Sequence, residues 1–449
     1  MSATYPALFA AAAATVYAIA FTPPAAAQSG EALETIREQI RQIQRSHASQ
    51  VEALEARIRE LEQKKPAAAP AAGIGQFTGG GAGNAFQVGL SGTFAGGGSS
   101  LDDTQLSTVQ GGGHDPNKNG FTVQSAELFL GGTVDPYFDA QAHIALFMDA
   151  DGETNVELEE AFLVTRALPW GLQAKAGQYL TEFGRHNTLH LHKFDFVDAP
   201  VVSTRLLGGD GLRNPGARLS WLTPAPWFSE ITFGVQNARG EGAKSFLGGA
   251  DEDETIGGLP SDNREVRNLG DVLYSARWLN GFDVSDTVST NFGLSGAWGR
   301  NSTGSGNRTS IYGADVYAKW QPEQTVRGFP FVSLHAEGMH RNFETGPDSE
   351  DLNDWGYFVQ ASWGFTPGWV AGLRFDRAVG DGDAFEDPDR DSRFRISPAL
   401  TWFPTEFSKL RLQYNHDRAH HLESQGENGA HTIWLQAEFS LGGHFAHTF

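Results

Sequence analysis

The sequence contains no cysteine among its 449 residues, and only 19% of its residues are charged. The absence of thiols excludes a disulfide framework and any thiolate metal site. After the first few tens of residues, no apolar run approaches the ~18 residues of a membrane-spanning helix. The formal net charge of −21 argues against nucleic acid as a partner. No nucleophile elbow or HExxH pattern occurs, so we do not expect an enzyme.

The N-terminal part divides into three segments before any strand pattern begins. An apolar run at residues 6–21, followed by PPAAAQ, predicts a signal peptide over residues 1–27. Residues 28–65 carry Leu, Ile and Val at heptad spacing, which predicts a periplasmic α-helical coiled coil. Its Ile-rich seam favours three strands, so we expect a homotrimer, with a lone amphipathic helix as the alternative. Residues 66–84 form an Ala/Pro/Gly linker.

Residues 85–449 alternate apolar and polar side chains with a period of two, which is typical of β-strands. In HTIWLQAEFSL, for example, Ile433 and Leu435 share one face and Trp434 and Gln436 the other. We expect sixteen strands, near residues 85–95, 121–134, 137–148, 156–166, 172–183, 213–222, 228–237, 271–279, 287–299, 310–320, 329–341, 355–365, 368–379, 391–402, 408–417 and 431–441.

The connections between these strands alternate in length. Short turns rich in Pro, Gly and aromatic residues alternate with long, acidic, Gly-rich loops, and Trp residues gather near strand ends. These features predict an all-β fold, a 16-stranded antiparallel transmembrane β-barrel with an N-terminal coiled-coil stalk. A soluble β-sandwich would give the same alternation, but not the two-sided asymmetry of the loops. A TonB-dependent receptor of ~22 strands around a plug is excluded by length.

The expected location is the outer membrane of a Gram-negative bacterium, with the stalk and the C-terminus in the periplasm. The terminal aromatic residue, Phe449, is then an assembly signal for the barrel-assembly machinery. The other expected partners are small-molecule solutes, outer-membrane lipid and lipopolysaccharide. No cofactor is required, although the acidic loops at residues 251–254 and 387–391 could bind Ca²⁺ or Mg²⁺.

The clearest family signal lies in residues 126–184, AELFLGGTVDPYFDAQAHIALF…VELEEAFLVTRALPWGLQAKAGQYLTEFG. This segment, with the order of signal peptide, coiled coil, linker and barrel, resembles the phosphate-selective porins O and P. The resemblance implies a porin that forms an aqueous channel for passive diffusion of small solutes, with anions as one candidate class. The chain is also similar to uncharacterised outer-membrane proteins that end in H-x-x-H-x-F, some of them labelled zinc-regulated receptors.

The predicted pore constriction is the long connection at residues 184–212, which is too apolar for a free surface loop. Its charged and histidine residues are Arg185, His186, His190, His192, Lys193 and Arg205. Basic residues at lumen-facing strand positions extend this set into a predicted cationic track: Lys175, Arg218, Arg277, Lys319, Arg374, Arg395 and Arg411. Acidic residues share the lumen, so a mixed-charge general pore is the alternative to anion preference.

Two further interpretations stay open at the level of sequence. Imidazoles without thiolates suit Zn²⁺, which makes divalent metal uptake or binding an alternative function, with His186, His190, His192, His444 and His447 as candidate ligands. The stalk could also tether the membrane to the cell wall, with the barrel as an anchor. Conductance separates these alternatives, because a pore must conduct and an anchor need not.

Overall fold

The structure is a computed structural model that describes residues 86–149, 152–248, 255–256, 259–260, 264–345, 351–380, 390–427 and 429–442. All of them belong to the second of two compact units, Ile74–Phe449. The predicted signal peptide, coiled-coil stalk and linker lie outside the described residues. So do Phe449, His444, His447 and the acidic segment 251–254.

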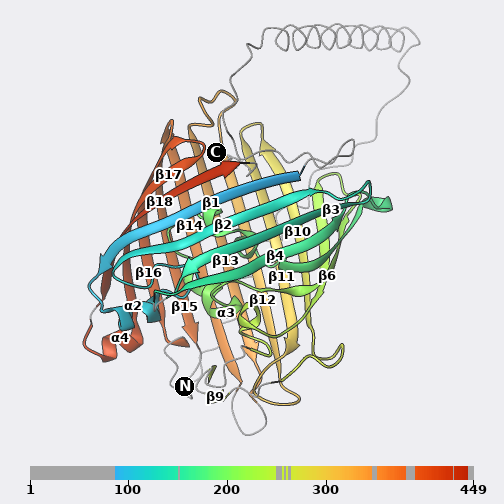
Figure 1. Cartoon of the computed structure of the whole chain (residues 1–449), viewed down its shortest axis with the longest axis horizontal. Coiled ribbons are helices and arrows are strands. Elements are labelled where there is room, and N and C mark those ends of the chain that lie inside the picture. Colours follow the sequence, from blue (N-terminus) through green and yellow to red (C-terminus); the bar gives the residue numbers. More distant parts are fainter. Residues whose placement is uncertain are drawn as a thin grey trace, which may run out of the picture. The chain divides into compact units, whose positions relative to one another are not determined.

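Sixteen antiparallel strands close into one barrel (Figure 1). The first eight are β1 (Phe86–Ser99), β2 (Gly120–Thr133), β3 (Phe138–Met148), β4 (Thr154–Thr165), β5 (Leu172–Leu180), β6 (Arg213–Leu222), β7 (Phe228–Gln236) and β10 (Leu273–Ser285). The second eight are β11 (Val288–Arg300), β12 (Arg308–Trp320), β13 (Phe331–Phe343), β14 (Leu352–Thr366), β15 (Trp369–Gly380), β16 (Arg393–Thr405), β17 (Ser408–Ala419) and β18 (Ala430–Gly442). Pairing of β1 with β18, from Gly89 opposite Gly442 to Ser99 opposite Thr432, closes the ring.

The predicted barrel and its strand number are confirmed, and most boundaries agree to within a few residues. The largest difference is at β10, which continues to Ser285 instead of ending near residue 279. The connection to β11 is therefore a tight turn at residues 286–287. Periodicity weakens in this segment because the polar Asn280 interrupts the apolar positions Trp278, Phe282 and Val284.

Alternation along each strand separates an apolar outer face from a polar lumen. In β18 the side chains of Ile433 and Leu435 are exposed on the outside, whereas Thr432 and Gln436 are buried inside. Exposed tryptophans lie at strand ends, among them Trp227, Trp320, Trp363, Trp369 and Trp402. This is the pattern of a barrel whose outer face contacts lipid, because only hydrocarbon matches an apolar band bounded by aromatic rings. Among the described residues, no helix is long and apolar enough to cross a membrane.

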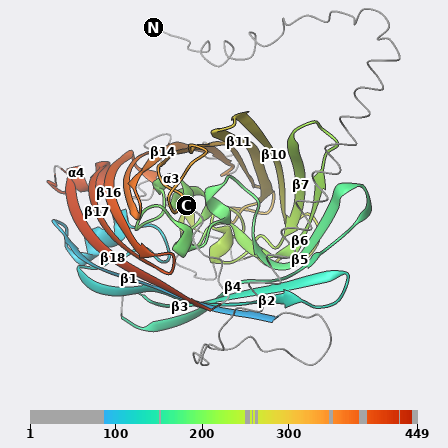
Figure 2. The same ribbon diagram turned by 90° about the horizontal axis from the view of Figure 1, so that it is seen from above.

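One end of the barrel carries short turns and the other carries the long connections. The long β1–β2 connection contains α2 (Asp103–Val109), and α4 (His420–Ser424) follows β17. Two short strands, β8 (Thr255–Ile256) and β9 (Leu259–Pro260), lie in the β7–β10 connection with the 3-10 turn η4 (Glu241–Ala243). The β5–β6 connection contains the 3-10 turns η2 (His186–Thr188) and η3 (Leu191–Lys193) and the helix α3 (Val201–Leu207). Figure 2 shows α3 inside the ring of strands.

Candidate functional site

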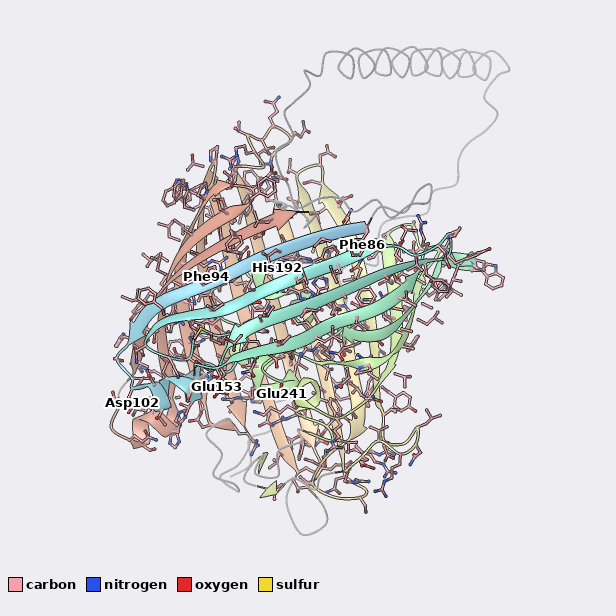
Figure 3. The ribbon with its side chains drawn as sticks, in the orientation of Figure 1. Phe86, Phe94, Asp102, Glu153, His192 and Glu241 are labelled. Atoms are coloured by element: carbon pink, nitrogen blue, oxygen red, sulfur yellow. The ribbon has the colours of Figure 1, made fainter. Side chains whose placement is uncertain are left out.

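The β5–β6 connection, residues 181–212, crosses the lumen and is named here the inward loop. Near its start, the backbone amides of Arg185 and His186 donate hydrogen bonds of 2.6 Å to Glu337 Oε1 of β13. Further along, His192 Nδ1 lies 2.7 Å from Glu127 Oε2 of β2. The loop therefore contacts the barrel wall on more than one side, as the sequence predicted for a loop folded into the pore. Figure 3 shows His192 near mid-height of the barrel.

Apolar side chains hold the second half of the inward loop against the wall. Val202, Leu206 and Leu207 are fully buried and pack with Phe183 and with Phe358 of β14. Full burial of such a side chain stabilises the docked loop by about 1.5–3 kcal/mol. This burial explains why the sequence of residues 184–212 is more apolar than that of an exposed loop.

A buried carboxylate, Asp198, fixes the middle of the inward loop to three consecutive strands. Its Oδ1 lies 2.6 Å from Arg374 Nη2 of β15, and its Oδ2 lies 3.0 Å from Arg395 Nη1 of β16. Gln413 and Asn415 of β17 donate further hydrogen bonds, of 3.0 and 2.6 Å. The Arg374 and Arg395 guanidiniums outweigh burial and hold the pKa of Asp198 well below its usual range. Asp198 is therefore an ionised anchor of the loop.

On the short-turn side of the inward loop lies a cavity of about 490 Å³, named here the basic chamber. Lys319 is next to the end of β12 and Lys409 next to the start of β17, which places the chamber toward the short turns. Two carboxylates, Asp195 and Asp198, line it against six cationic side chains. These six are Arg185, Lys193, Lys319, Arg374, Lys409 and Arg411.

Not all of these cations are neutralised by a neighbouring carboxylate. Arg374 pairs with Asp198 and Asp376, and Lys409 Nζ lies 2.8 Å from Glu438 Oε2. Within the described part of the chain, the remaining four cations form no ion pair. The Arg185 guanidinium lies 3.9 Å from the ring centroid of Tyr317, and Lys319 Nζ lies 5.2 Å from that of Phe331. The basic chamber therefore combines cations that form no ion pair with aromatic rings.

A second cavity, of about 580 Å³, lies on the long-loop side and is named here the acidic chamber. Phe147, near the end of β3, and Asn155, near the start of β4, place it toward the long loops. Its charged lining consists of Asp149, Glu157, Asp210, Glu241 and Lys244. Figure 3 shows Glu241 closer than His192 to the end where the long connections gather. Charge of opposite sign thus faces the two sides of the inward loop.

A β-bulge in β4 directs the side chains of two consecutive glutamates into the lumen, toward the inward loop. Register against β3 shifts between His143, which pairs with Glu160, and Ile144, which pairs with Leu158. The extra residue is Glu159, so Glu159 and Glu160 are both buried in the lumen. His190 lies between them, with Nδ1 at 3.0 Å from Glu159 Oε2 and Nε2 at 2.9 Å from Glu160 Oε2. Burial opposes the charge of this imidazole, but the two glutamates outweigh it and raise the pKa of His190 to about 10.

The residues predicted for the pore constriction occupy three different places. Arg185, His186, His192 and Lys193 line the basic chamber. His190 lies at the β4 bulge, and its ring stacks on that of His143 with centroids 4.1 Å apart. Arg205 is buried away from the basic chamber, where its Nη1 donates a 2.8 Å hydrogen bond to the carbonyl of Asp391.

The predicted metal ligands in the inward loop do not converge as a trio. The rings of His190 and His192 are parallel, with centroids 5.9 Å apart. His186 instead packs against Phe194 and Phe358, with ring centroids at 4.5 and 5.8 Å. Burial, with the nearby His335 and Arg374, holds the pKa of His186 well below its usual range. Zinc binding by His186, His190, His192, His444 and His447 stays a prediction.

The predicted cationic track also divides. Lys319, Arg374 and Arg411 line the basic chamber, whereas Arg395 is held between Asp198 and Asp417. The other three lie on other strands beside carboxylates: Lys175 and Arg218 next to Glu182, and Arg277 next to Asp315. The seven residues are all directed into the lumen, but they do not form one continuous ladder of unpaired charge.

Several lumen residues were missed by the sequence analysis. His114, in the β1–β2 connection, faces Glu157 and Glu159 of β4 and Asp210 of the inward loop. Alternation in V-E-L-E-E could have placed Glu157 and Glu159 together on one face. No sequence signal brings His114 and Asp210 to the same place, because two separate loops must fold inward for them to meet.

Comparison with known proteins identifies one relative in sequence. Over 368 residues the chain is 31% identical to an uncharacterized protein of Aquifex aeolicus (strain VF5), covering 75% of this chain and 73% of that protein. No protein-family model matches the chain.

Solved structures similar to the barrel include outer-membrane porins. An anion-selective porin from Comamonas acidovorans is 12% identical, with a TM-score of 0.48 over 79% of this chain and 98% of that one. Pseudomonas putida OprB is 12% identical, with a TM-score of 0.47 over 80% and 94% of the two chains. Salmonella typhi OmpF, in a complex with daunomycin, is 10% identical, with a TM-score of 0.47 over 80% and 98%. At this level of similarity they assign no solute to this chain, and the resemblance to the phosphate-selective porins stays a prediction.

Proposed function

The chain belongs to the same family as the uncharacterized Aquifex aeolicus protein, and from the barrel itself we propose that it is an outer-membrane diffusion channel for small solutes with a preference for anions. The proposal concerns passive conduction through the lumen. It assigns no catalytic step to the chain.

The observation that carries this proposal is the charge of the basic chamber. Six cations and two carboxylates line about 490 Å³, and four of the cations form no ion pair among the described residues. Positive charge on low-dielectric walls concentrates small anions and repels cations. Aromatic rings beside Arg185 and Lys319 add apolar surface, so organic anions fit this chamber as well as inorganic ones.

Support for the membrane location comes from the outer face of the barrel. Large apolar side chains such as Leu412, Ile433 and Leu435 are exposed on strands, and exposed tryptophans lie near the strand ends. In water, such a surface would drive aggregation, whereas in a bilayer it matches the hydrocarbon region. The inward loop narrows the lumen, so the proposed channel has a lower conductance than an unobstructed barrel of sixteen strands.

Planar-bilayer recording tests the proposal. Insertion of the purified full-length protein should produce discrete conductance steps. In a KCl gradient, the reversal potential should lie between zero and the equilibrium potential of chloride. The absence of any step would favour the alternative of a membrane anchor or tether. Steps that select for cations would contradict the assignment of the basic chamber as the selective element.

We further propose that the channel is a homotrimer, on the basis of the Ile-rich heptads of residues 28–65. Chemical crosslinking of the full-length protein and of a variant without residues 30–63 tests this proposal. We expect the variant to lose the trimer but to keep a folded barrel. A monomeric full-length protein would contradict the proposed homotrimer.

A further inference from the structure

We propose that His114, Glu157, Glu159 and Asp210 form a binding site for a divalent transition-metal ion at the border of the acidic chamber. The four side chains come from three parts of the fold: the β1–β2 connection, strand β4 and the end of the inward loop. A metal ion bound there would join both inward-folded loops to the barrel wall. The site is independent of whether the barrel conducts.

The distances around His114 Nε2 fit ligands of a common ion better than they fit hydrogen bonds. Nε2 lies 3.3 Å from Glu159 Oε1, 3.7 Å from Glu157 Oε2 and 4.0 Å from Asp210 Oδ1. Hydrogen bonds are shorter, at about 2.7–3.2 Å. Ligand atoms at ~2.0–2.2 Å from one Zn²⁺ in tetrahedral geometry lie about 3.3–3.6 Å apart. The ligand atoms of His114, Glu157 and Glu159 lie within 4.8 Å of one another, and a movement of the Asp210 side chain would bring its oxygen to the same ion.

Three of the atoms that face one another have no hydrogen-bond partner among the described residues. They are His114 Nε2, Glu157 Oε2 and Asp210 Oδ1, and each of these atoms is buried. The side chains of the three residues are only 11, 17 and 13% exposed. Buried polar atoms without partners are costly, so three of them directed at one point make a place where a bound cation would be stabilising.

The second polar atoms of His114, Glu157 and Glu159 are already engaged, which orients the atoms that face one another. His114 Nδ1 lies 3.1 Å from the carbonyl oxygen of Gln124 and donates to it, so Nε2 is the ring nitrogen that faces the carboxylates. Glu159 Oε2 accepts from His190, and Glu157 Oε1 accepts from Arg213. Metal-binding histidines and carboxylates are commonly held by such outer contacts. The site is thus preorganised on the protein side.

The ligand set defines the class of metal. One imidazole with three carboxylates suits Zn²⁺, Mn²⁺ or Fe²⁺, whereas Ca²⁺ and Mg²⁺ prefer oxygen ligands alone. A divalent ion would offset much of the negative charge of three carboxylates, and Arg213 beside Glu157 offsets more. Glu157 and Asp210 also line the acidic chamber, together with Glu241 and Lys244, so an ion can reach the site from the long-loop side.

The alternative occupant is a proton, shared between His114 Nε2 and the carboxylates. Metal titration distinguishes the two, because a cluster that binds only a proton gives no saturable metal uptake. The protein is purified at full length in detergent, stripped with EDTA and titrated calorimetrically with Zn²⁺, Mn²⁺ and Ca²⁺. His114→Gln removes the imidazole, and Asp210→Asn removes the negative charge of one carboxylate. His420→Gln removes an exposed histidine of α4, far along the chain from the site, as the matched control.

We expect saturable Zn²⁺ and Mn²⁺ binding that is at least about tenfold weaker in His114→Gln and Asp210→Asn, and unchanged in His420→Gln. In pulsed electron paramagnetic resonance of bound Mn²⁺, the hyperfine coupling to the imidazole nitrogen should disappear in His114→Gln. If that variant does not fold as a barrel, by circular dichroism, Asp210→Asn decides the question. No saturable Zn²⁺ or Mn²⁺ binding, or equal affinity in both site variants and the control, would overturn the proposal. The proposal would also be overturned if Ca²⁺ bound as tightly as Zn²⁺ and Mn²⁺ and if its affinity were the same in His114→Gln. His114 would then not be a ligand.

Discussion

The Asp198 carboxylate of the inward loop lies 2.6 Å from the Arg374 guanidinium of β15, and both side chains are buried. Arg374 Nη1 also donates a 2.7 Å hydrogen bond to the backbone carbonyl of Asp198. One arginine thus holds both the main chain and the side chain of the loop at the point where it borders the basic chamber. This contact is therefore one of those that hold the loop in the lumen.

Replacing Asp198 with Asn should release the middle of the inward loop. The asparagine keeps the shape but loses the charge that faces Arg374 and Arg395, and breaking a buried ion pair costs about 3–5 kcal/mol. We expect a higher and noisier single-channel conductance with an intact barrel. Asp195→Asn is the control, because Asp195 lines the same chamber but receives one 3.0 Å hydrogen bond, from Gln360. Equal conductance in both variants and the wild type would show that Asp198 does not hold the loop in place.

Docking of the inward loop should weaken in mild acid through His186. Its pKa is lowered by burial and by the charges of His335 and Arg374, so the docked imidazole stays neutral. In the unfolded chain the imidazole takes up a proton below about pH 6.5, and this favours the unfolded state as pH falls. At pH 5.5 the free energy of unfolding is lowered by at most about 1.4 kcal/mol through this imidazole. The thermal midpoint of the wild type should therefore fall more than that of His186→Gln between pH 7.5 and 5.5. Parallel changes in the two proteins would contradict this role of His186.

Gly177, in the segment KAGQY, should not tolerate a side chain. Its φ is +134°, and an added Cβ would meet the carbonyl oxygen of Ala161 and lie 2.6 Å from Cα of Phe162 in β4. We expect Gly177→Ala to destabilise the β4–β5 pairing by about 1–3 kcal/mol, because the conformation is strained and the contact is with backbone. Gly306→Ala, where an added Cβ meets nothing within 4 Å, is the matched control. Identical thermal midpoints for the two variants would refute the prediction.

The sequence predicted the strands well because each strand carries its own period-two pattern. Ile433 and Leu435 point to the lipid side and Gln436 to the lumen for the same local reason in the sequence and in the structure. The inward direction of the β5–β6 connection was also predictable, since apolar residues such as Val202 and Leu206 need a wall to pack against.

The arrangement of side chains within the lumen could not be predicted in the same way. A bulge at Glu159 turns two consecutive glutamates inward, and alternation alone would have put Glu160 on the lipid side. Pairing of Arg395 with Asp198 depends on where the loop docks, so the sequence could not show which basic residues stay unpaired. Likewise, His114 and Asp210 meet only because two distant loops enter the same lumen.

Charge reversal in the basic chamber is the most direct test of its role in ion selectivity. Arg185 and Lys193 line the chamber without forming an ion pair among the described residues, so Arg185→Glu with Lys193→Glu changes the local charge by four units without breaking one. Arg327→Glu changes an exposed residue of the turn between β12 and β13 and serves as the control for altered charge. The measurement is the reversal potential in a KCl gradient. We predict an anion-selective wild type, a shift toward cations in the double variant and no shift in the control. An unchanged reversal potential in the double variant would contradict the assignment of the basic chamber as the selective element of the pore.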